Sequence, residues 1–164
     1  MVGLNLCPFA LPVLREDGLR VEVSRARELE TITRVLWDAL SAFPGGDAHT
    51  VLVVFPDAFP DFLDFNDYQN VVEGLLAELG LEGVVQVPTF HPHYRFAGES
   101  DEDASHYTNR APYPMFHLLR ESDVDRARQE HPDTLQIPER NVARLRSLGV
   151  ERVRGILQKC LAVD

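Results

Sequence analysis

Three strand-like runs alternate with two helix-like segments in the first half of the chain, and this order restricts the folds it can adopt. Residues 19–23 alternate apolar and polar side chains, which predicts an edge strand. Residues 50–55 form an uninterrupted apolar and β-branched run, typical of a strand covered on both faces. Residues 84–89 form a third, mostly apolar run, so we expect three strands here.

The two segments between these runs have helical spacing of apolar residues. Ser24 can cap the first, which ends at the Pro-Gly-Gly of residues 44–46, and the second extends from Asp61 to Gly80. Strands joined through helices imply right-handed crossovers and parallel pairing. We therefore expect an α/β fold with a small three-stranded, mainly parallel sheet flanked by helices, in a single domain covering residues 1–164.

The regular pattern stops after Thr89. Residues 90–114 form a long segment rich in aromatic side chains and histidine, and loops of such length are usually functional or disordered. The aromatic content argues against disorder. Helices are predicted again at residues 115–121 and from Ser122, Pro138 and Val150, so the C-terminal half should be helical. Cys160 falls on the apolar face of the last helix and is expected in the core.

Composition narrows the class of function. The 164 residues are 45% hydrophobic and 26% charged, as in ordinary globular proteins. No apolar stretch approaches the roughly 20 residues of a membrane span, and no leader-like segment opens the chain. Sixteen basic and 26 acidic residues give a net charge of −10, which argues against nucleic-acid binding. Cys7 and Cys160 form no CxxC pair, so we expect cytosolic thiols and a cytoplasmic protein.

The long segment leaves the carboxyl end of the third predicted strand, where open parallel sheets bind ligands. One hypothesis for it is metal binding. His91 and His93 project to the same side of an extended chain, and His106, His117 or Cys7 could complete a set. The alternative is that these histidines form ordinary hydrogen bonds.

A second hypothesis for the same segment is anion recognition. Asn109, Arg110 and Arg120 could bind a carboxylate or phosphate, with Tyr107 and Tyr113 as hydroxyl donors. The N-terminus of the helix predicted near residue 115 could add free N–H groups. The alternative is that both arginines pair with nearby carboxylates and only stabilise the loop.

A third hypothesis is thiol chemistry. Cys7 is followed by a proline and lies outside any amphipathic stripe. A cysteine becomes a nucleophile when a neighbour stabilises its thiolate, and His91 or His117 could do so through space. The alternative is that Cys7 is a small buried apolar residue.

Five groups of residues form a specific order of motifs. They are Gly3-Leu4-Asn5-Leu6-Cys7-Pro8-Phe9-Ala10, Phe62-Leu63-Asp64-Phe65-Asn66, Thr89-Phe90-His91-Pro92 with Phe96-Ala97, Tyr107-Thr108-Asn109-Arg110 with Pro112-Tyr113-Pro114, and His117-Leu118-Leu119-Arg120-Glu121. Together they resemble the domain-of-unknown-function 1415 (DUF1415) family, from the first residues to Gly149. The resemblance implies no established activity, substrate or cofactor.

The resemblance also bears on individual residues. The side chains that match the family pattern are those of Cys7, His91, Asn109, Arg110, His117 and Arg120. His93 and His106 stand where the family implies Asp and Asn, which makes them poor candidates for essential ligands. The resemblance further implies a helix ahead of Gly3, so either the start site is late or this helix is missing, and either would be expected to expose apolar surface near Cys7.

The leading hypothesis is a cytosolic enzyme, or an enzyme-like binder, that acts on a small anionic metabolite. Its anion would be bound by Asn109, Arg110, Tyr107 and Arg120, its protons moved by His91 or His117, and its nucleophile would be Cys7. We expect Cys7, His91, Asn109, Arg110 and His117 to meet in one cleft. The alternatives are a non-catalytic metal-binding protein that uses Cys7 and His91, and a protein-interaction module whose long loop is the partner surface. These residues indicate no particular cofactor or oligomeric state.

Overall fold

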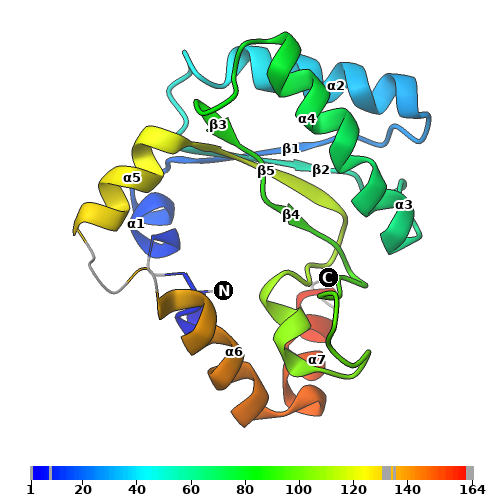
Figure 1. Cartoon of the computed structure of the whole chain (residues 1–164), viewed down its shortest axis with the longest axis vertical. Helices are drawn as coiled ribbons and strands as arrows, with labels where there is room; N and C mark the ends of the chain where they lie inside the picture. The colour runs from blue at the N-terminus through cyan, green and yellow to red at the C-terminus, as the bar shows by residue number, and fades with distance from the viewer. Residues whose placement is uncertain (1, 8, 131–133, 135, 162–164) are drawn as a thin grey trace.

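The computed structural model describes residues 2–7, 9–130, 134 and 136–161. Its centre is a five-stranded mixed sheet in the order β1-β2-β5-β3, with β4 also paired to β5 (Figure 1). The strands are β1 (Leu19–Val23), β2 (Thr50–Val54), β3 (Val85–Gln86), β4 (Thr89–Phe90) and β5 (Met115–Arg120). β1 runs parallel to β2, whereas β5 runs antiparallel to β2, β3 and β4. The α/β class is confirmed, but the expected three-stranded, mainly parallel sheet is wrong.

Residues 115–120, which were expected to be helical, form β5 in the middle of the sheet. Phe116 and Leu118 are fully buried, while Met115, His117 and Leu119 are half-buried on the opposite face. This alternation has the period of two of a strand. A short apolar run is compatible with a buried strand and with a helix. Residues 115–120 form a strand because they pair with strands that are distant in sequence. The helix start expected near residue 115 as part of an anion site is therefore wrong as well.

The third expected strand, residues 84–89, is broken into two. Pro88 has no N–H group to donate to a ladder, and it separates β3 from β4. Its carbonyl oxygen still accepts a hydrogen bond from the His117 N–H group at 2.9 Å. Both short strands therefore remain paired with β5.

The main core lies between one face of the sheet and the helices α2 (Leu29–Ala42), α3 (Phe62–Asp67) and α4 (Gln69–Glu78) (Figure 1). Asp61 begins α3 as expected, because its carboxylate accepts the N–H groups of Leu63 and Asp64. Ser24 does not cap α2, since Glu28 occupies the N-cap position. The fully buried core side chains are Ile32, Leu36, Leu40, Val51, Val53, Phe55, Phe65, Phe116 and Leu118.

A second, smaller cluster forms from the ends of the chain. It contains Leu6, Ala104, Leu145 and Val153, and so joins the N-terminal segment to η2 (Ala104–Thr108), α6 (Ile137–Leu148) and α7 (Val150–Leu161). The remaining elements are η1 (Val2–Leu4), α1 (Ala10–Arg15) and α5 (Glu121–Glu130).

The C-terminal helices confirm most of what the sequence predicts for them. The helices expected from Ser122, Pro138 and Val150 correspond to α5, α6 and α7, although Ser122 lies inside α5 rather than capping it. Cys160 is exposed on α7, so its expected burial is wrong. None of the described helices is long and apolar enough to cross a membrane.

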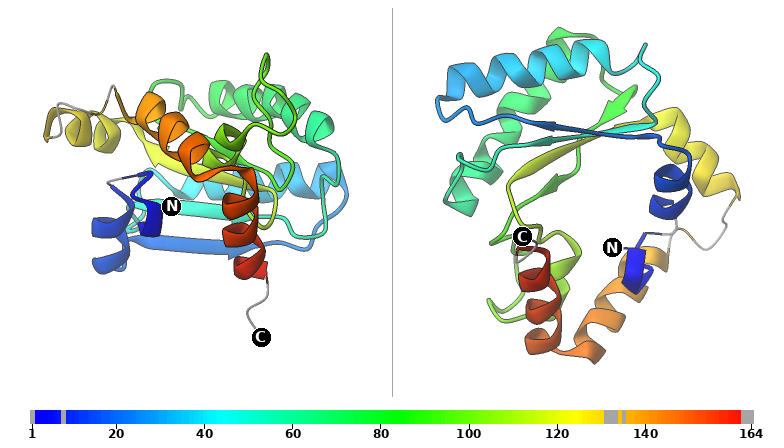
Figure 2. Two further views of the ribbon diagram at one scale, coloured as in Figure 1. Left: turned by 90° about the horizontal axis from the view of Figure 1, so that it is seen from below. Right: turned by 180° about the vertical axis from the view of Figure 1, so that it is seen from behind.

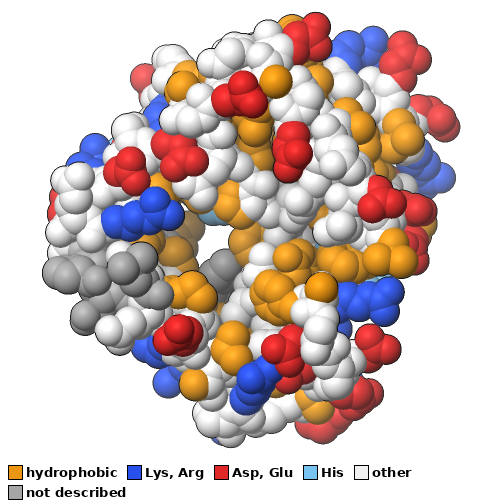
Figure 3. All heavy atoms as spheres, viewed as in Figure 1, with side chains coloured by type: hydrophobic (Ala, Val, Ile, Leu, Met, Phe, Trp, Pro, Cys, Tyr) orange, Lys and Arg blue, Asp and Glu red, His pale blue; other side chains and the backbone are white. Residues whose placement is uncertain are grey.

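On the face of the sheet opposite α2 and α4, Thr50 and Val54 of β2 are buried, but the edge strand β1 is exposed. On β1, 52% of Val21 and 62% of Val23 remain exposed. Figure 3 shows an opening between the sheet and the α6–α7 pair, bordered by hydrophobic side chains.

Candidate functional site

His91, at the start of the long loop, is buried in the main core. Its Nδ1 atom accepts the His93 N–H group at 3.0 Å, so Nε2 carries the proton and donates to the Phe59 carbonyl oxygen at 2.8 Å. The Phe62 and Phe65 rings lie at 5.6 and 5.2 Å from the imidazole. Burial lowers the pKa of His91 and keeps it neutral. Both ring nitrogens are therefore engaged by the backbone of the protein.

His117 lies on the opposite face of the sheet, where it is half-buried. The Thr50 hydroxyl donates to the Leu118 carbonyl oxygen at 2.9 Å and accepts the His117 Nε2–H group at 2.5 Å. Burial lowers the pKa of His117 to about 4, so the ring is neutral near pH 7 and Nδ1 holds its lone pair. Since Phe116, the neighbour of His117 on β5, packs against Phe65 and thus faces the His91 side, the two histidines lie on different faces of the sheet.

Asn109 connects the two ends of the long loop. Its carbonyl oxygen accepts the His91 N–H group at 3.1 Å, and its side-chain amide donates to the Thr89 carbonyl oxygen at 3.2 Å. These bonds hold the segment after η2 against β4. Asn109 and His91 are therefore brought together, but through main-chain bonds.

Arg110 forms a hydrogen bond to the rest of the protein through the Nε edge of its guanidinium group. Nε donates to the Tyr94 carbonyl oxygen at 2.9 Å, and the guanidinium carbon lies 4.6 Å from the centre of the Tyr107 ring. Within the described part of the chain, its two Nη groups have no hydrogen-bond partner. Arg110 thus has remaining capacity to bind an anion, and Tyr113 nearby in sequence is 43% exposed.

Arg120, on β5, binds the protein itself. Its guanidinium donates to the carbonyl oxygens of Phe43, Gly46 and Ala48 at 2.7 to 2.9 Å, just beyond the C-terminus of α2. It also lies 4.5 Å above the Phe43 ring and 3.6 Å from the Asp123 carboxylate. The guanidinium N–H groups of Arg120 therefore serve as hydrogen-bond donors for carbonyl oxygens at and just after the end of α2.

Cys7 is half-buried near the second, smaller cluster. The carbonyl oxygen of its neighbour Leu6 accepts a hydrogen bond from Asn141 of α6 at 2.7 Å. Among the described residues, no hydrogen bond or ring contact joins Cys7 to His91 or His117. Because His91 and His117 lie on different faces of the sheet, the structure does not bring these two side chains together, whereas a site shared by Cys7, His91 and Arg110 stays a prediction.

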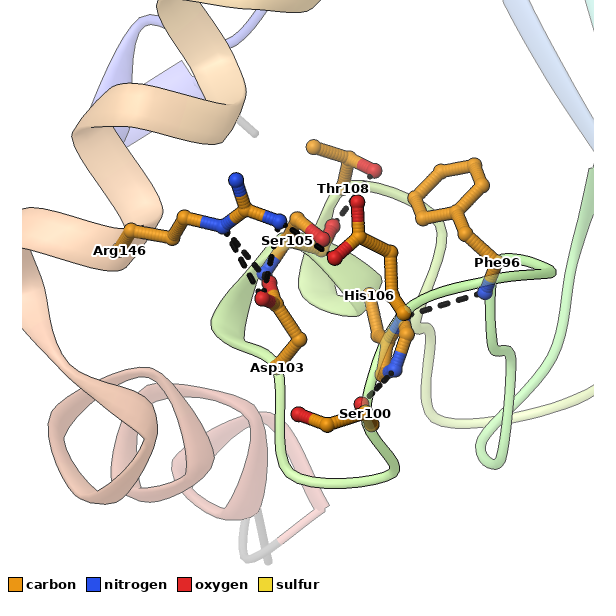
Figure 4. A network of polar contacts seen from close by, with 8 residues as sticks. Phe96, Ser100, Asp103, Ser105, His106, Thr108 and Arg146 are labelled. Carbon is orange, nitrogen blue, oxygen red and sulfur yellow. Dashed lines mark hydrogen bonds and ion pairs between the residues drawn. The ribbon is translucent and has the colours of Figure 1, made fainter.

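The middle of the long loop is fastened to α6 by a polar network (Figure 4). Arg146 binds the carboxylates of Asp103 and Glu99 at 2.9 and 2.7 Å. The hydrogen bond from Arg146 makes the largest contribution to lowering the pKa of Asp103 well below its ordinary value. The fully buried His106 accepts the Phe96 N–H group at Nδ1 and, through Nε2, donates to the Ser100 carbonyl oxygen. His106 therefore orders this loop.

An open cleft of about 530 Å³ lies between the N-terminal segment and α6, and most of the residues that line it are exposed. Asn5, on its wall, adopts a left-handed conformation with φ of 50°, which asparagine tolerates better than most residues. Arg140 and Arg144, one helical turn apart, also line the cleft, and they make no ion pair within the described ranges. The described residues that line it are Leu4, Asn5, Arg140, Ala143, Arg144 and Ser147.

Sequence reasoning missed these two arginines because they look like the exposed face of an ordinary helix. A signal was nevertheless present. Residues 137–161 carry six basic and two acidic side chains, a local charge of +4 in a chain of −10. Arg146 and Arg154 are paired with carboxylates, whereas Arg140 and Arg144 are not paired in the described structure.

The described residues include no group of three or more His, Cys, Asp or Glu side chains arranged to hold a metal ion. In comparisons with known proteins, no curated protein and no solved structure matches the chain. The family model described as protein of unknown function (DUF1415) matches residues 1–155, which confirms the resemblance seen in the motifs. The chain belongs to this family of proteins of unknown function.

Proposed function

We propose that this protein binds a small anion, with a carboxylate or phosphate group, in the cleft between its N-terminal segment and α6. The observation that carries the proposal is the pair of arginines in that cleft, Arg140 and Arg144, which have no ion-pair partner among the described residues. Side chains four residues apart on a helix lie about 5–6 Å from each other at Cβ. Two guanidinium forks at this spacing can therefore converge on one carboxylate or phosphate.

The charge distribution supports the same location. A chain with a net charge of −10 repels anions at long range, so a site for one needs local cations. The α6–α7 segment provides a local charge of +4, and three of its arginines, Arg140, Arg144 and Arg152, have no carboxylate partner among the described residues. The side chains of Asn5 and Ser147 add polar groups beside them.

The proposal concerns binding and includes no reaction. Cys7, His91 and His117 have the side chains for nucleophilic and acid–base chemistry, but the described contacts do not bring them together. Arg110, whose Nη groups are unoccupied among the described residues, is the rival anion ligand. The test must therefore separate the cleft from the loop.

The test is thermal unfolding with phosphate, sulfate or a small dicarboxylate at constant ionic strength. We compare the wild type with Arg140→Gln/Arg144→Gln and with Arg110→Gln. A ligand that binds the native state alone stabilises it by about 2.7 kcal/mol at one hundred times its Kd. The matched control is Arg34→Gln, which removes an exposed arginine of α2 that has no ion pair within the described residues.

We expect one anion to raise the midpoint in the wild type, in Arg110→Gln and in the control, and the shift to disappear in the double variant. Absence of any anion-specific shift up to tens of millimolar would contradict the proposal, since binding that weak gives less than about 3 kcal/mol of affinity. A shift lost in Arg110→Gln and kept in the double variant would place the anion at the loop instead.

A further inference from the structure

β1 is the outer strand of the sheet, with β2 on its inner side (Figure 2, left). The Gly18 carbonyl oxygen accepts the Thr50 N–H group at 3.0 Å, and the Ser24 N–H group donates to the Val54 carbonyl oxygen at 2.9 Å. In a parallel pair, alternate residues direct both backbone groups toward the neighbouring strand. The N–H and C=O groups of the intervening residues, Leu19, Val21 and Val23, therefore point away from the sheet.

The outer edge of β1 carries two charged side chains, but it lacks a proline, a bulge and, among the described residues, a covering segment. These are features that natural proteins use to keep an edge strand from pairing with another chain. The register of β1 with β2 is continuous over all five residues, and the strand contains no proline. Its outward backbone groups have no hydrogen-bond partner among the described residues, and Val21 and Val23 are 52% and 62% exposed.

The sequence of β1 is complementary to itself when read in the opposite direction. In an antiparallel pair centred on Val21, Leu19 lies opposite Val23 and Arg20 lies opposite Glu22. Within one chain, Arg20 and Glu22 already form an ion pair at 2.9 Å, with side chains 44% and 36% exposed. A second copy therefore presents an opposite charge to each charged residue and an apolar side chain to each apolar one.

We propose that two copies of this chain associate through antiparallel pairing of their β1 strands, around a two-fold axis at Val21. Leu19, Val21 and Val23 are the residues that direct N–H and C=O groups outward, so Val21 forms a hydrogen-bonded pair with its symmetry mate and Leu19 pairs with Val23. The two sheets become one continuous sheet, in an isologous interface. The Arg20–Glu22 ion pair within each chain is exchanged for the same pair between chains.

Charge reversal tests this pairing directly, because the two halves of the interface can be made complementary only to each other. Arg20→Glu places Glu opposite Glu, and Glu22→Arg places Arg opposite Arg, in a homodimer. A mixture of the two variants restores opposite charges at every position. Like charges directly opposite destabilise a strand pair, so each single variant should self-associate at least about tenfold more weakly than the wild type.

The measurement is sedimentation velocity of the full chain over a concentration series. The wild type should dimerise, Arg27→Glu should behave like the wild type as the off-strand control, and an equimolar mixture of the reversal variants should regain dimers. The double variant Arg20→Glu/Glu22→Arg keeps the complementarity, so it should dimerise even where a single variant folds poorly. A monomeric wild type up to about 1 mM, or reversal variants that associate like the wild type, would overturn the proposal.

Discussion

Replacing His117 with Gln should remove a large part of the pH dependence of stability between pH 4 and 6.5. His117 has a pKa of about 4 in the folded protein, because burial opposes its charged form, against an ordinary value of 6.5. Between these values the unfolded chain binds a proton that the folded protein does not. Acidification therefore favours unfolding, and the stability that depends on neutral His117 is complete above pH 6.5 and lost as the pH falls toward 4.

The size of the effect follows from the difference between the two pKa values. A difference of about 2.5 units, at 1.36 kcal/mol per unit, corresponds to about 3 kcal/mol between neutral pH and pH 4. At pH 5.5 the linkage relation gives about 1.4 kcal/mol, a tenfold change in the folding equilibrium. The amide of Gln can donate to the Thr50 hydroxyl as Nε2 does, but it does not titrate.

Urea unfolding of the wild type and His117→Gln at pH 7.5, 6.5 and 5.5 measures this linkage. The difference in unfolding free energy between the two proteins isolates His117, because His91 and the carboxylates titrate in both. We expect the wild type to lose about 1.4 kcal/mol more than the variant between pH 7.5 and 5.5. A difference that stays constant over this range, or an imidazole of His117 that titrates near 6.5 by NMR, would refute the reasoning.

Two further predictions concern arginines that hold the fold. Arg120→Met should lower the free energy of unfolding by about 3 kcal/mol in urea, because three carbonyl oxygens after α2 lose a charged donor, and a loss below about 1 kcal/mol would contradict this role. Asp103→Asn keeps an acceptor for the Ser105 N–H group but removes the charge bound by Arg146, so amide exchange in residues 99–106 should accelerate. Exchange rates equal to those of the wild type would show that this ion pair does not order the loop.

The elements that the sequence predicts correctly are those set by local periodicity. α2, β2 and the start of α3 follow from apolar spacing and from the Asp61 cap, which depend on neighbours within a few residues. β5 does not follow, because Met115–Arg120 becomes a strand through ladders with β2, β3 and β4. Long-range pairing of this kind is not encoded in the spacing of six residues.

The site residues illustrate a similar division. His91, Asn109 and Arg120 stand out in the sequence as polar residues without an obvious local role. Each of their side chains binds a backbone carbonyl group distant in sequence, which composition and motif spacing do not reveal. Arg140 and Arg144 were missed for the opposite reason, because an exposed helical arginine is unremarkable until it is known to have no carboxylate partner among the described residues.

The central position of β5 has a consequence for synthesis on the ribosome. β2 is complete after residue 54 and β4 after residue 90, but both pair with a strand that ends at Arg120. A nascent chain that stops before Met115 lacks Phe116 and Leu118, and so exposes the apolar side chains of the main core that pack against them. The first 114 residues therefore cannot complete their sheet as they emerge, and they depend on the last third of the chain to bury their core.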